Sequence, residues 1–273
     1  PYMNLDYYSH SGPMARSVED VILMQSLTSG IHNQDIASLH KVIPFDYNLD
    51  LKGVKIAWSD NLCGFEIEDD VLQNLNNAIN IFTDLGAVVE KVNLGLSNKI
   101  LDATEVYLNS LWGTSLREEV KGKEEFLSSY TKKYLDHSKE RSLSDFINCN
   151  IVAWDAFSKF GPILEKYDIF LCPTNAVTGI PANHGYPNLE FEFNGIKRET
   201  KPDGDETMWL TTPFNMMSRL PVMSVPTGFA SNNIPTGMQI VGNPYDDNSV
   251  FKISLAYEKA IQWLFNKENR PLF

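Results

Sequence analysis

"VKIAWSDNLCGFEIEDDVLQNLNNAINIFTDLGAVVEKVNL", residues 54–94, contains two short β-branched runs on either side of an amphipathic stretch. The runs at 54–58 and 87–94 have the composition of strands. Between them, residues 68–85 have the apolar spacing of a helix, and Gly86 follows where that helix should end. Its apolar face is formed by Val71, Leu75, Ala78, Ile79, Phe82 and Leu85. Strand, helix and strand in this order predict a βαβ unit of a layered α/β sheet.

The same spacing predicts three further helices, which begin at Ser17 and span residues 143–167 and 249–265. Ser17 and the two carboxylates after it resemble a capping box. A more polar helical region occupies residues 101–140. The side chains expected on the buried faces are Val21, Met24 and Leu27 or Thr28 in the first helix, Leu143, Ile147, Trp154, Phe157 and Leu164 in the second, and Val250, Ile253, Tyr257, Ile261 and Leu264 in the third.

Three more strands are expected at residues 167–174, 221–229 and 237–242, and the turn "SNNIPTG" makes the last two neighbours. Residues 178–205 are rich in proline and glycine and predict a long surface loop or a hairpin. No linker divides the chain, so residues 1–273 are expected to form a single domain. The predicted fold class is α/β, with a layered mixed β-sheet flanked by helices on both faces.

The composition restricts the classes of partner. The 23 Lys and Arg residues stand against 35 Asp and Glu residues, a net charge of -12, which disfavours nucleic acid and anionic membranes as partners. Cys63, Cys149 and Cys172 are widely spaced, which favours a reducing, cytoplasmic compartment over a disulfide framework. The five histidines are scattered, so we expect neither a metal site nor a cofactor, and a small or uncharged substrate fits best.

"GPMARSVEDV", residues 12–21, resembles the GPM-x-R-[ST]-V-x-D segment of the amidase signature family. Four further blocks resemble that family in matching order: "LKGVKIAW", "LGAVVEKVNL", "YDIFLCPT" and "FNMMSRLPVMSVPTGFASNNIPTGMQIVG". Five ordered blocks cover nearly the whole chain, whereas any one of them alone would be a weak match. One departure is Arg219, which stands where the family commonly has glycine, two residues before Pro221.

This resemblance implies a hydrolase that cleaves a carboxamide C–N bond through a serine nucleophile, a second serine beyond a cis bond and a lysine base. A base must activate the serine, and backbone amides must hold the oxyanion. The sequence holds no clustered Gly-Ser run of the kind that the family uses for this purpose. We therefore expect the triad to precede residue 1, with this chain as the C-terminal part of a larger amidase domain and no catalytic residue of its own.

The expected partners are a small-molecule amide and the protein's own N-terminal half, and a homodimer stays open. Two alternatives to an amidase remain. One is a non-catalytic scaffold or binding chain, either a degenerate or a processed paralogue. The other is the glutamine-hydrolysing subunit of a tRNA-dependent amidotransferase, which would need partner subunits and a carboxylate or arginine for the glutamine α-groups. An indole at Trp209 argues against that second alternative.

Two stretches are the best candidates for contact with substrate. "PTNAVTGIP" follows a strand end, where loops of α/β sheets meet ligands, and contributes Thr174 and Asn175. "MWLTTPFN" contributes Trp209, whose indole offers area and one donor, and Thr212 as apolar lining. Asn215 is expected to hold backbone through its amide rather than to bind substrate.

Several other residues fit a structural role better than a chemical one. Met216 and Met217 fit core packing, and the start of a helix accounts for Arg16, Glu19 and Asp20. "GTSLREE", residues 113–119, lacks the final glycine of a serine-hydrolase elbow. Cys172 is best read as a small buried residue at a strand end.

Overall fold

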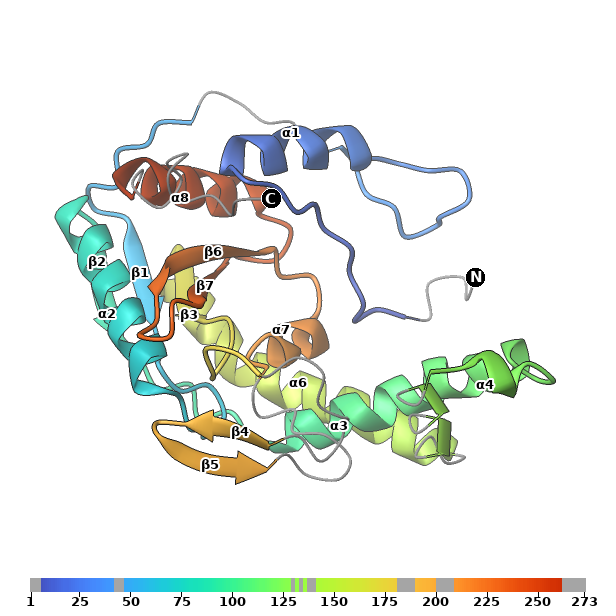
Figure 1. The fold of residues 1–273 in the computed structure, drawn as a ribbon. Helices are drawn as coiled ribbons and strands as arrows, with labels where there is room; N and C mark the ends of the chain where they lie inside the picture. Colours follow the sequence, from blue (N-terminus) through green and yellow to red (C-terminus); the bar gives the residue numbers. More distant parts are fainter. Residues whose placement is uncertain are drawn as a thin grey trace.

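The computed structural model describes residues 6–41, 47–128, 131–132, 135–136, 141–180, 190–199 and 209–261. Within them, five strands form one mixed sheet in the order β2-β1-β3-β7-β6 (Figure 1). β1 pairs in parallel with both β2 and β3, whereas β7 pairs antiparallel with β3 and β6. The strands are β1 (Lys55–Trp58), β2 (Val88–Lys91), β3 (Ile169–Pro173), β6 (Val222–Phe229) and β7 (Pro235–Val241).

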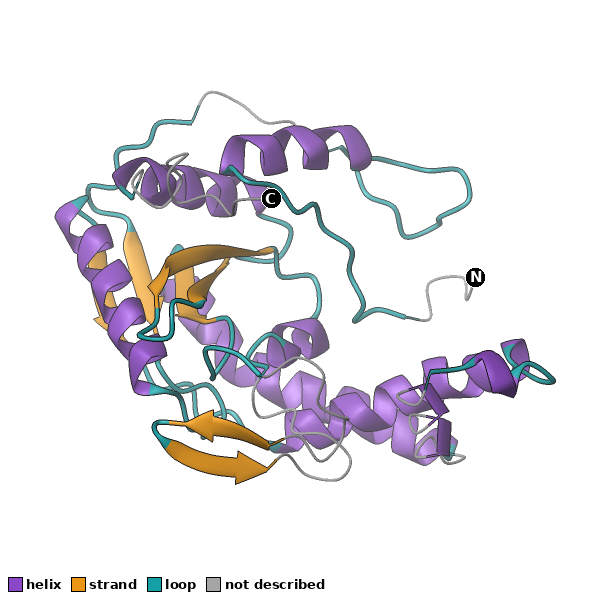
Figure 2. Ribbon diagram, in the orientation of Figure 1, coloured by secondary structure: helices purple, strands orange, loops and turns teal. Residues whose placement is uncertain are grey.

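Helices cover both faces of this sheet (Figure 2). Successive side chains of a strand point to opposite faces, so one strand packs on both helical layers. Ile169 and Leu171 of β3 pack on α2 (Asp69–Asp84) and α8 (Asp247–Ala260). Phe170 and Cys172 face the other way, into the core that α3 (Lys99–Leu108), α6 (Leu143–Lys166) and α7 (Thr212–Met217) share. The predicted fold class, a mixed sheet flanked by helices on both faces, is confirmed.

The βαβ unit at residues 54–94 forms as its sequence predicts. All the expected apolar side chains of α2 are buried except Leu85, which is partly exposed. Gly86 ends the turn after α2 with a φ of +89°, and a Cβ there would lie 3.4 Å from Cα of Lys52. The positive φ therefore favours a glycine here, whereas a Cβ would meet only ordinary van der Waals contact.

The helix that begins after Ser17 is α1 (Val18–Thr28), and the Ser17 Oγ accepts a hydrogen bond from the Asp20 backbone N–H at 3.2 Å. The predicted buried stripe was wrong for Met24 and Leu27, whose side chains are 50% and 68% exposed, whereas Val21 is partly buried. Val18, Ile22 and Ser26 are buried instead. The reason is that α1 packs on α8, whose Phe251 and Leu255 meet the face that begins at Val18.

The predicted inner face of α6 was right only in part. Leu164 is buried and Phe157 packs against the core partly buried, but Leu143, Ile147 and Trp154 are exposed, and small residues take the buried positions that precede Phe160. The buried residues are Cys149, Ala153, Ala156, Phe160 and Leu164. Because α3 packs along α6, small side chains allow the two backbones to approach, and the bulky ones are left outside.

The remaining elements follow the sequence in outline. The polar region yields α3, a π-helical turn η1 (Asn109–Gly113), α4 (Thr114–Glu119) and a 3-10 turn η2 (Glu124–Phe126). Residues 190–199 form a hairpin of β4 (Glu190–Phe193) and β5 (Ile196–Glu199).

In α8 the expected side chains up to Ile261 are buried. The rest of the helix expected at 249–265, with Leu264, lies outside the described residues, as does most of the loop around the hairpin. None of the described helices is long and apolar enough to cross a membrane.

Candidate functional site

The chain leaves β3 beside the start of β7 and the middle of β6. The Thr174 N–H donates to the Gly237 carbonyl at 2.9 Å, and the Thr174 and Ser224 hydroxyls lie 2.7 Å apart. Thr174 is half-buried, so its hydroxyl is held in place while still reaching the surface. Three strands thus bring two hydroxyl groups together at one end of the sheet.

The next residue, Asn175, joins the second predicted stretch. Asn175 and Trp209 form an isolated antiparallel bridge, although they are 34 positions apart in the chain. Both side chains are exposed, and the indole of Trp209 is 42% accessible. Thr174, Asn175 and Trp209 therefore lie together beyond the end of β3, and we call this group the β3 wall.

Gln239, a buried glutamine of β7, hydrogen-bonds to the backbone next to the β3 wall on its interior side. The Gln239 amide nitrogen lies 3.1 Å from the carbonyl oxygens of Pro173 and Leu210, and the residue is 1% exposed. It ties the end of β3 to the chain just after Trp209. A buried amide that satisfies two carbonyls at once fixes the relative position of their segments.

Thr212 and the methionines do not reach this surface. Thr212 begins α7 and is 8% exposed, and Met216 and Met217 are buried in the same helix. The structure therefore separates Thr212 from the other predicted contact residues. Asn215 acts as expected, since its side-chain amide donates to the Tyr8 carbonyl at 2.9 Å.

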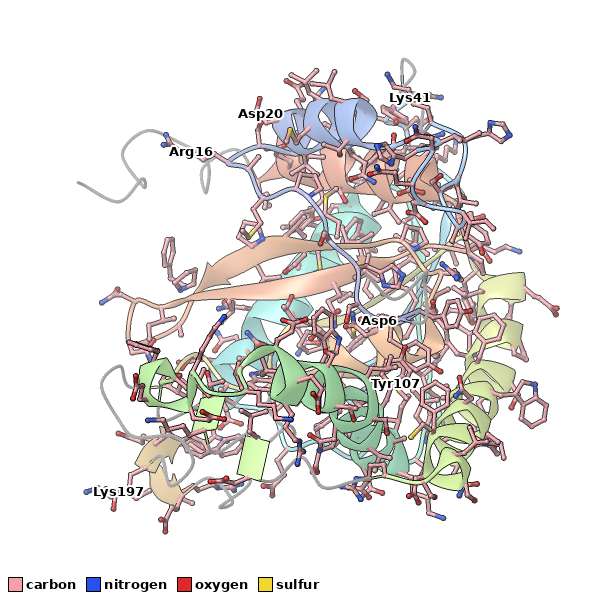
Figure 3. All side chains as sticks on the ribbon, turned by 90° about the vertical axis from the view of Figure 1, so that its right-hand side faces the viewer. Asp6, Arg16, Asp20, Lys41, Tyr107 and Lys197 are labelled. Carbon is pink, nitrogen blue, oxygen red and sulfur yellow. The ribbon has the colours of Figure 1, made fainter. Side chains whose placement is uncertain are left out.

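That contact belongs to a set of bonds that fastens residues 6–9 across the helices. The Asp6 carboxylate accepts from the backbone N–H of Tyr8 and Ser9 at 3.1 and 3.0 Å. It also accepts from the Tyr107 hydroxyl at 3.2 Å and from the Trp112 indole at 2.9 Å. Figure 3 shows Asp6 beside Tyr107, with Arg16 and Asp20 elsewhere, at the start of α1. We call this arrangement the Asp6 clamp.

The electrostatics of the Asp6 clamp favour a charged carboxylate. Burial by itself would raise the pKa of Asp6, but hydrogen bonds from Ser9, Tyr8 and Trp112 outweigh it and hold the pKa below its ordinary value. Burial raises the pKa of Tyr8 to about 12, so its phenol stays protonated and its hydroxyl donates to Asn150 at 2.9 Å. The clamp is built from one anion and neutral donors.

Cys172 has the buried, structural role that the sequence favours. Cys172 is fully buried, and burial raises the pKa of its thiol well above the usual range, so it is not a poised nucleophile. Arg16, Glu19 and Asp20 are exposed at the start of α1. Ser115 of the "GTSLREE" stretch lies within α4, where its hydroxyl donates to a backbone carbonyl.

Arg219 adopts a φ of +60°, and Ser218 before it a φ of +55°. This left-handed region favours glycine, so the backbone itself explains why the family commonly places glycine at Arg219. The Arg219 guanidinium lies 5.5 Å from the ring centre of Tyr7, next to the Asp6 clamp. The departure therefore places a long side chain beside Tyr7, on a backbone whose positive φ favours glycine.

Sequence reasoning missed Gln239, Ser224 and Asp6. A glutamine inside the apolar run "GMQIVG" was a usable signal, because a polar side chain in a buried strand needs a partner. No local signal marks Asp6, since two of its donors lie more than 100 positions away.

A mixed sheet covered by helices, with polar loop residues gathered where β3 ends, defines a layered α/β protein of the kind that binds ligands at strand ends. The sequence profile of the Amidase family matches residues 6–251. The chain belongs to the amidase signature family.

Individual relatives agree with this assignment. The chain is 27% identical over 282 residues to a subunit of the glutamyl-tRNA(Gln) amidotransferase of Pediococcus pentosaceus, covering 92% of this chain and 54% of the relative. It is similar to a bacterial aryl acylamidase of the amidase signature family, with a TM-score of 0.78 and 26% identity over 96% of this chain and 55% of that chain. A glutamyl-tRNA(Gln) amidotransferase subunit from Thermotoga maritima shares the fold, with a TM-score of 0.59 at 24% identity over 91% of this chain and 52% of that chain. The chain thus spans about half the length of the relatives that it matches.

Proposed function

We propose that this chain is part of an amidase that hydrolyses a carboxamide C–N bond, and that it supplies scaffold and one wall of the substrate pocket. The observation that carries the proposal is the family match over residues 6–251. The likeness to a bacterial aryl acylamidase over 96% of the chain supports it.

In this proposal the groups that make and break bonds lie outside residues 1–273. A serine, deprotonated through a second serine and a lysine, attacks the carbonyl carbon and forms a tetrahedral oxyanion. Collapse expels the amine, which takes up a proton, and leaves an acyl-serine ester. Water then hydrolyses this ester to the carboxylate and restores the serine. The absence of a Gly-Ser-rich run from the sequence supports this placement.

The β3 wall is the surface that we assign to substrate binding. The exposed indole of Trp209 offers a flat apolar face with one N–H donor, and the Asn175 amide both donates and accepts. Thr174 adds a hydroxyl paired with Ser224. Such a wall suits an uncharged amide with an apolar group. Thr212, which is buried, would act on this surface only indirectly.

A second candidate is a glutamine-hydrolysing component of an amidotransferase, which the names of the curated relatives favour at 26–28% identity. That function would need a charged group for the glutamine α-carboxylate, and the β3 wall consists of Thr174, Asn175 and Trp209. A third candidate, a scaffold without activity, predicts no turnover of any amide.

These candidates separate in one assay with the complete natural protein. It should be offered para-nitroacetanilide, an aliphatic amide and glutamine, with release of nitroaniline or ammonia as the readout. Turnover of the anilide or the aliphatic amide supports the amidase. Turnover of glutamine alone, increased by partner subunits, would indicate the amidotransferase, and no turnover would indicate the scaffold.

Trp209→Ala tests the β3 wall within that assay. We expect about a tenfold fall in kcat/KM for the anilide, carried mainly by KM, because truncation removes contact area from bound substrate. The matched control is Trp154→Ala. Trp154 is also an exposed tryptophan but belongs to α6, so its truncation should leave kcat and KM unchanged. Equal effects of the two substitutions would remove Trp209 from the binding surface.

A further inference from the structure

The outer side of α6 carries an apolar stripe that the described elements leave exposed. Its members are the side chains of Leu143, Ile147, Ile151 and Trp154. They follow one another at intervals of four, four and three residues, which is the spacing of one helix face. Leu143 and Trp154, at the two ends, are 74% and 70% exposed. We call these four residues the α6 stripe.

The α6 stripe is separate from the face that α6 turns to the core. At 100° per residue, its centre lies roughly 135° round the helix from the centre of the buried face, which runs from Cys149 to Leu164. That buried face meets α3, α7 and β3. Figure 3 shows α6, in yellow-green, along one edge of the molecule. A surface helix is normally polar opposite its buried face, so a second apolar face marks an interaction surface.

This surface is distinct from the exposed apolar face of α1. α6 packs on the side of the sheet to which Phe170 and Cys172 point. α1 packs on α8, which covers the opposite side of the sheet. The exposed residues of α1 and the α6 stripe therefore lie on different sides of the sheet, and the α6 stripe needs an occupant of its own.

The order of residues in the α6 stripe is self-complementary when two helices run in opposite directions. In a two-fold interface, a contact from position i to position j is repeated from j to i. Antiparallel α6 helices that cross near residues 148 and 149 set Leu143 against Trp154 of the second copy, and Ile147 against Ile151. A large ring then meets a smaller side chain at each end, and isoleucines meet in the middle.

The charges beside the α6 stripe fit the same arrangement. Arg141 comes just before α6 and is exposed, and Asp155 follows Trp154 and forms a half-exposed ion pair with Lys159 at 2.8 Å. The register that pairs Leu143 with Trp154 brings Arg141 of each copy beside Asp155 of the other. A parallel pair would instead set Arg141 against Arg141 and Asp155 against Asp155, and like charges in contact are unfavourable.

From this pattern we infer that a second copy of this protein occupies the α6 stripe, as an antiparallel helix pair with two-fold symmetry. Covering the four side chains and their polar flanks in both copies buries on the order of 1,000 Å², the lower end for specific interfaces. The dimer therefore dissociates reversibly, in the micromolar range, because a small interface only just outweighs the freedom lost on association. The inference does not rest on the proposed function, since the β3 wall takes no part in it.

Sedimentation equilibrium of the complete natural protein, over a wide range of concentrations, tests the dimer. We expect a reversible monomer–dimer equilibrium. Ile151→Glu places a charge at the centre of the interface and should weaken the dimer at least tenfold, with kcat and KM for any amide substrate unchanged. Ile196→Glu is the matched control, because Ile196 is an exposed isoleucine of β5 outside the α6 stripe. A protein that stays monomeric, or a dimer that survives Ile151→Glu, would overturn the inference.

Cross-linking tests the direction of the helices without weakening the fold. Leu143→Cys and Trp154→Cys are made as separate variants of the complete protein, and a short bismaleimide is added to each alone and to their mixture. The antiparallel pair predicts cross-linked dimers chiefly in the mixture. The unsubstituted protein is the control, in which Cys63, Cys149 and Cys172 are buried. Cross-linking of either variant alone as fast as in the mixture would contradict the antiparallel arrangement.

A charge exchange tests the register. Arg141→Glu sets two carboxylates together at each end of the pair and should weaken the dimer about fivefold, less at high salt. Adding Asp155→Arg to this variant restores opposite charges and should recover most of the affinity. If the double variant dimerised no better than Arg141→Glu alone, Arg141 and Asp155 would not meet across the interface and the proposed register would be wrong.

Discussion

At the residue scale, Asp6 shows how one carboxylate can organise a segment that has no secondary structure. Its two oxygens take four donors, from its own turn and from α3 and η1. Charge-assisted hydrogen bonds of this kind are about twice as strong as neutral ones. The Asp6 clamp therefore holds residues 6–9 against the helices.

Asp6→Asn should lower the free energy of unfolding by roughly 2 kcal/mol near pH 7, because an amide cannot accept all four donors. Urea denaturation of the complete protein measures this. The control is Asp155→Asn in the exposed pair with Lys159, which should cost less than about 0.5 kcal/mol.

The contribution of the Asp6 carboxylate should also depend on pH. A depressed pKa stabilises the fold above the unfolded value of about 3.9, and this contribution is lost as the pH falls through the folded pKa. The difference between the natural protein and Asp6→Asn should therefore shrink below about pH 4. A difference that stayed constant down to pH 3 would show that the charge of Asp6 plays no part.

At the element scale, the end of α7 sets an unusual demand on the chain. Ser218 caps the helix and Arg219 follows it, both with positive φ, and the Arg219 carbonyl accepts from the Tyr245 N–H at 3.0 Å. A left-handed conformation costs a non-glycine residue roughly 1–2 kcal/mol. The turn is therefore held by its surroundings rather than by its sequence.

Two substitutions at Arg219 separate backbone from side chain. Arg219→Gly should be more stable than Arg219→Ala by about 1 kcal/mol, since both lose the contact with Tyr7 and only glycine relieves the strain. Thermal unfolding of the two variants gives the comparison. If the alanine variant were as stable as the glycine variant, the positive φ at this position would carry no cost.

The elements also show what a sequence can and cannot predict. The βαβ unit was predictable because α2 buries a full apolar stripe and ends at a glycine, and both signals are local. Much of the inner faces of α1 and α6 was not, because the neighbouring helix decides which side chains fit. In α6 a close neighbour selects Ala153 and Ala156 over Trp154.

The same division holds for the β3 wall. Thr174 and Asn175 were predictable because they follow a strand, and polar loops collect at strand ends. Their bridge to Trp209 and the hydrogen bonds of Gln239 join segments 29 or more positions apart, which local patterns do not encode.

At the scale of the whole molecule, the described residues leave a strand edge and several apolar side chains open to solvent. In the described part of the chain β6 pairs on one side only, with β7, and Val222 and Phe229 at its ends are 39% and 45% exposed. Leu23 and Leu27 add an exposed face on α1. Open strand edges and apolar faces favour association.

The isolated chain of residues 1–273 is therefore expected to aggregate and to be inactive on amides. Co-expression with the rest of the natural protein should keep it in solution. Size-exclusion chromatography and an anilide assay check both points. A stable monomer of these residues that hydrolysed the anilide would contradict the division of labour that we propose.

The most direct test of that division is to locate the nucleophile. The complete protein should be treated with a serine-directed fluorophosphonate, digested, and the labelled peptide sequenced by mass spectrometry. Our account predicts a single labelled serine outside residues 1–273, with loss of amide hydrolysis in step with labelling. A label on a side chain within residues 1–273 that abolished activity would contradict it.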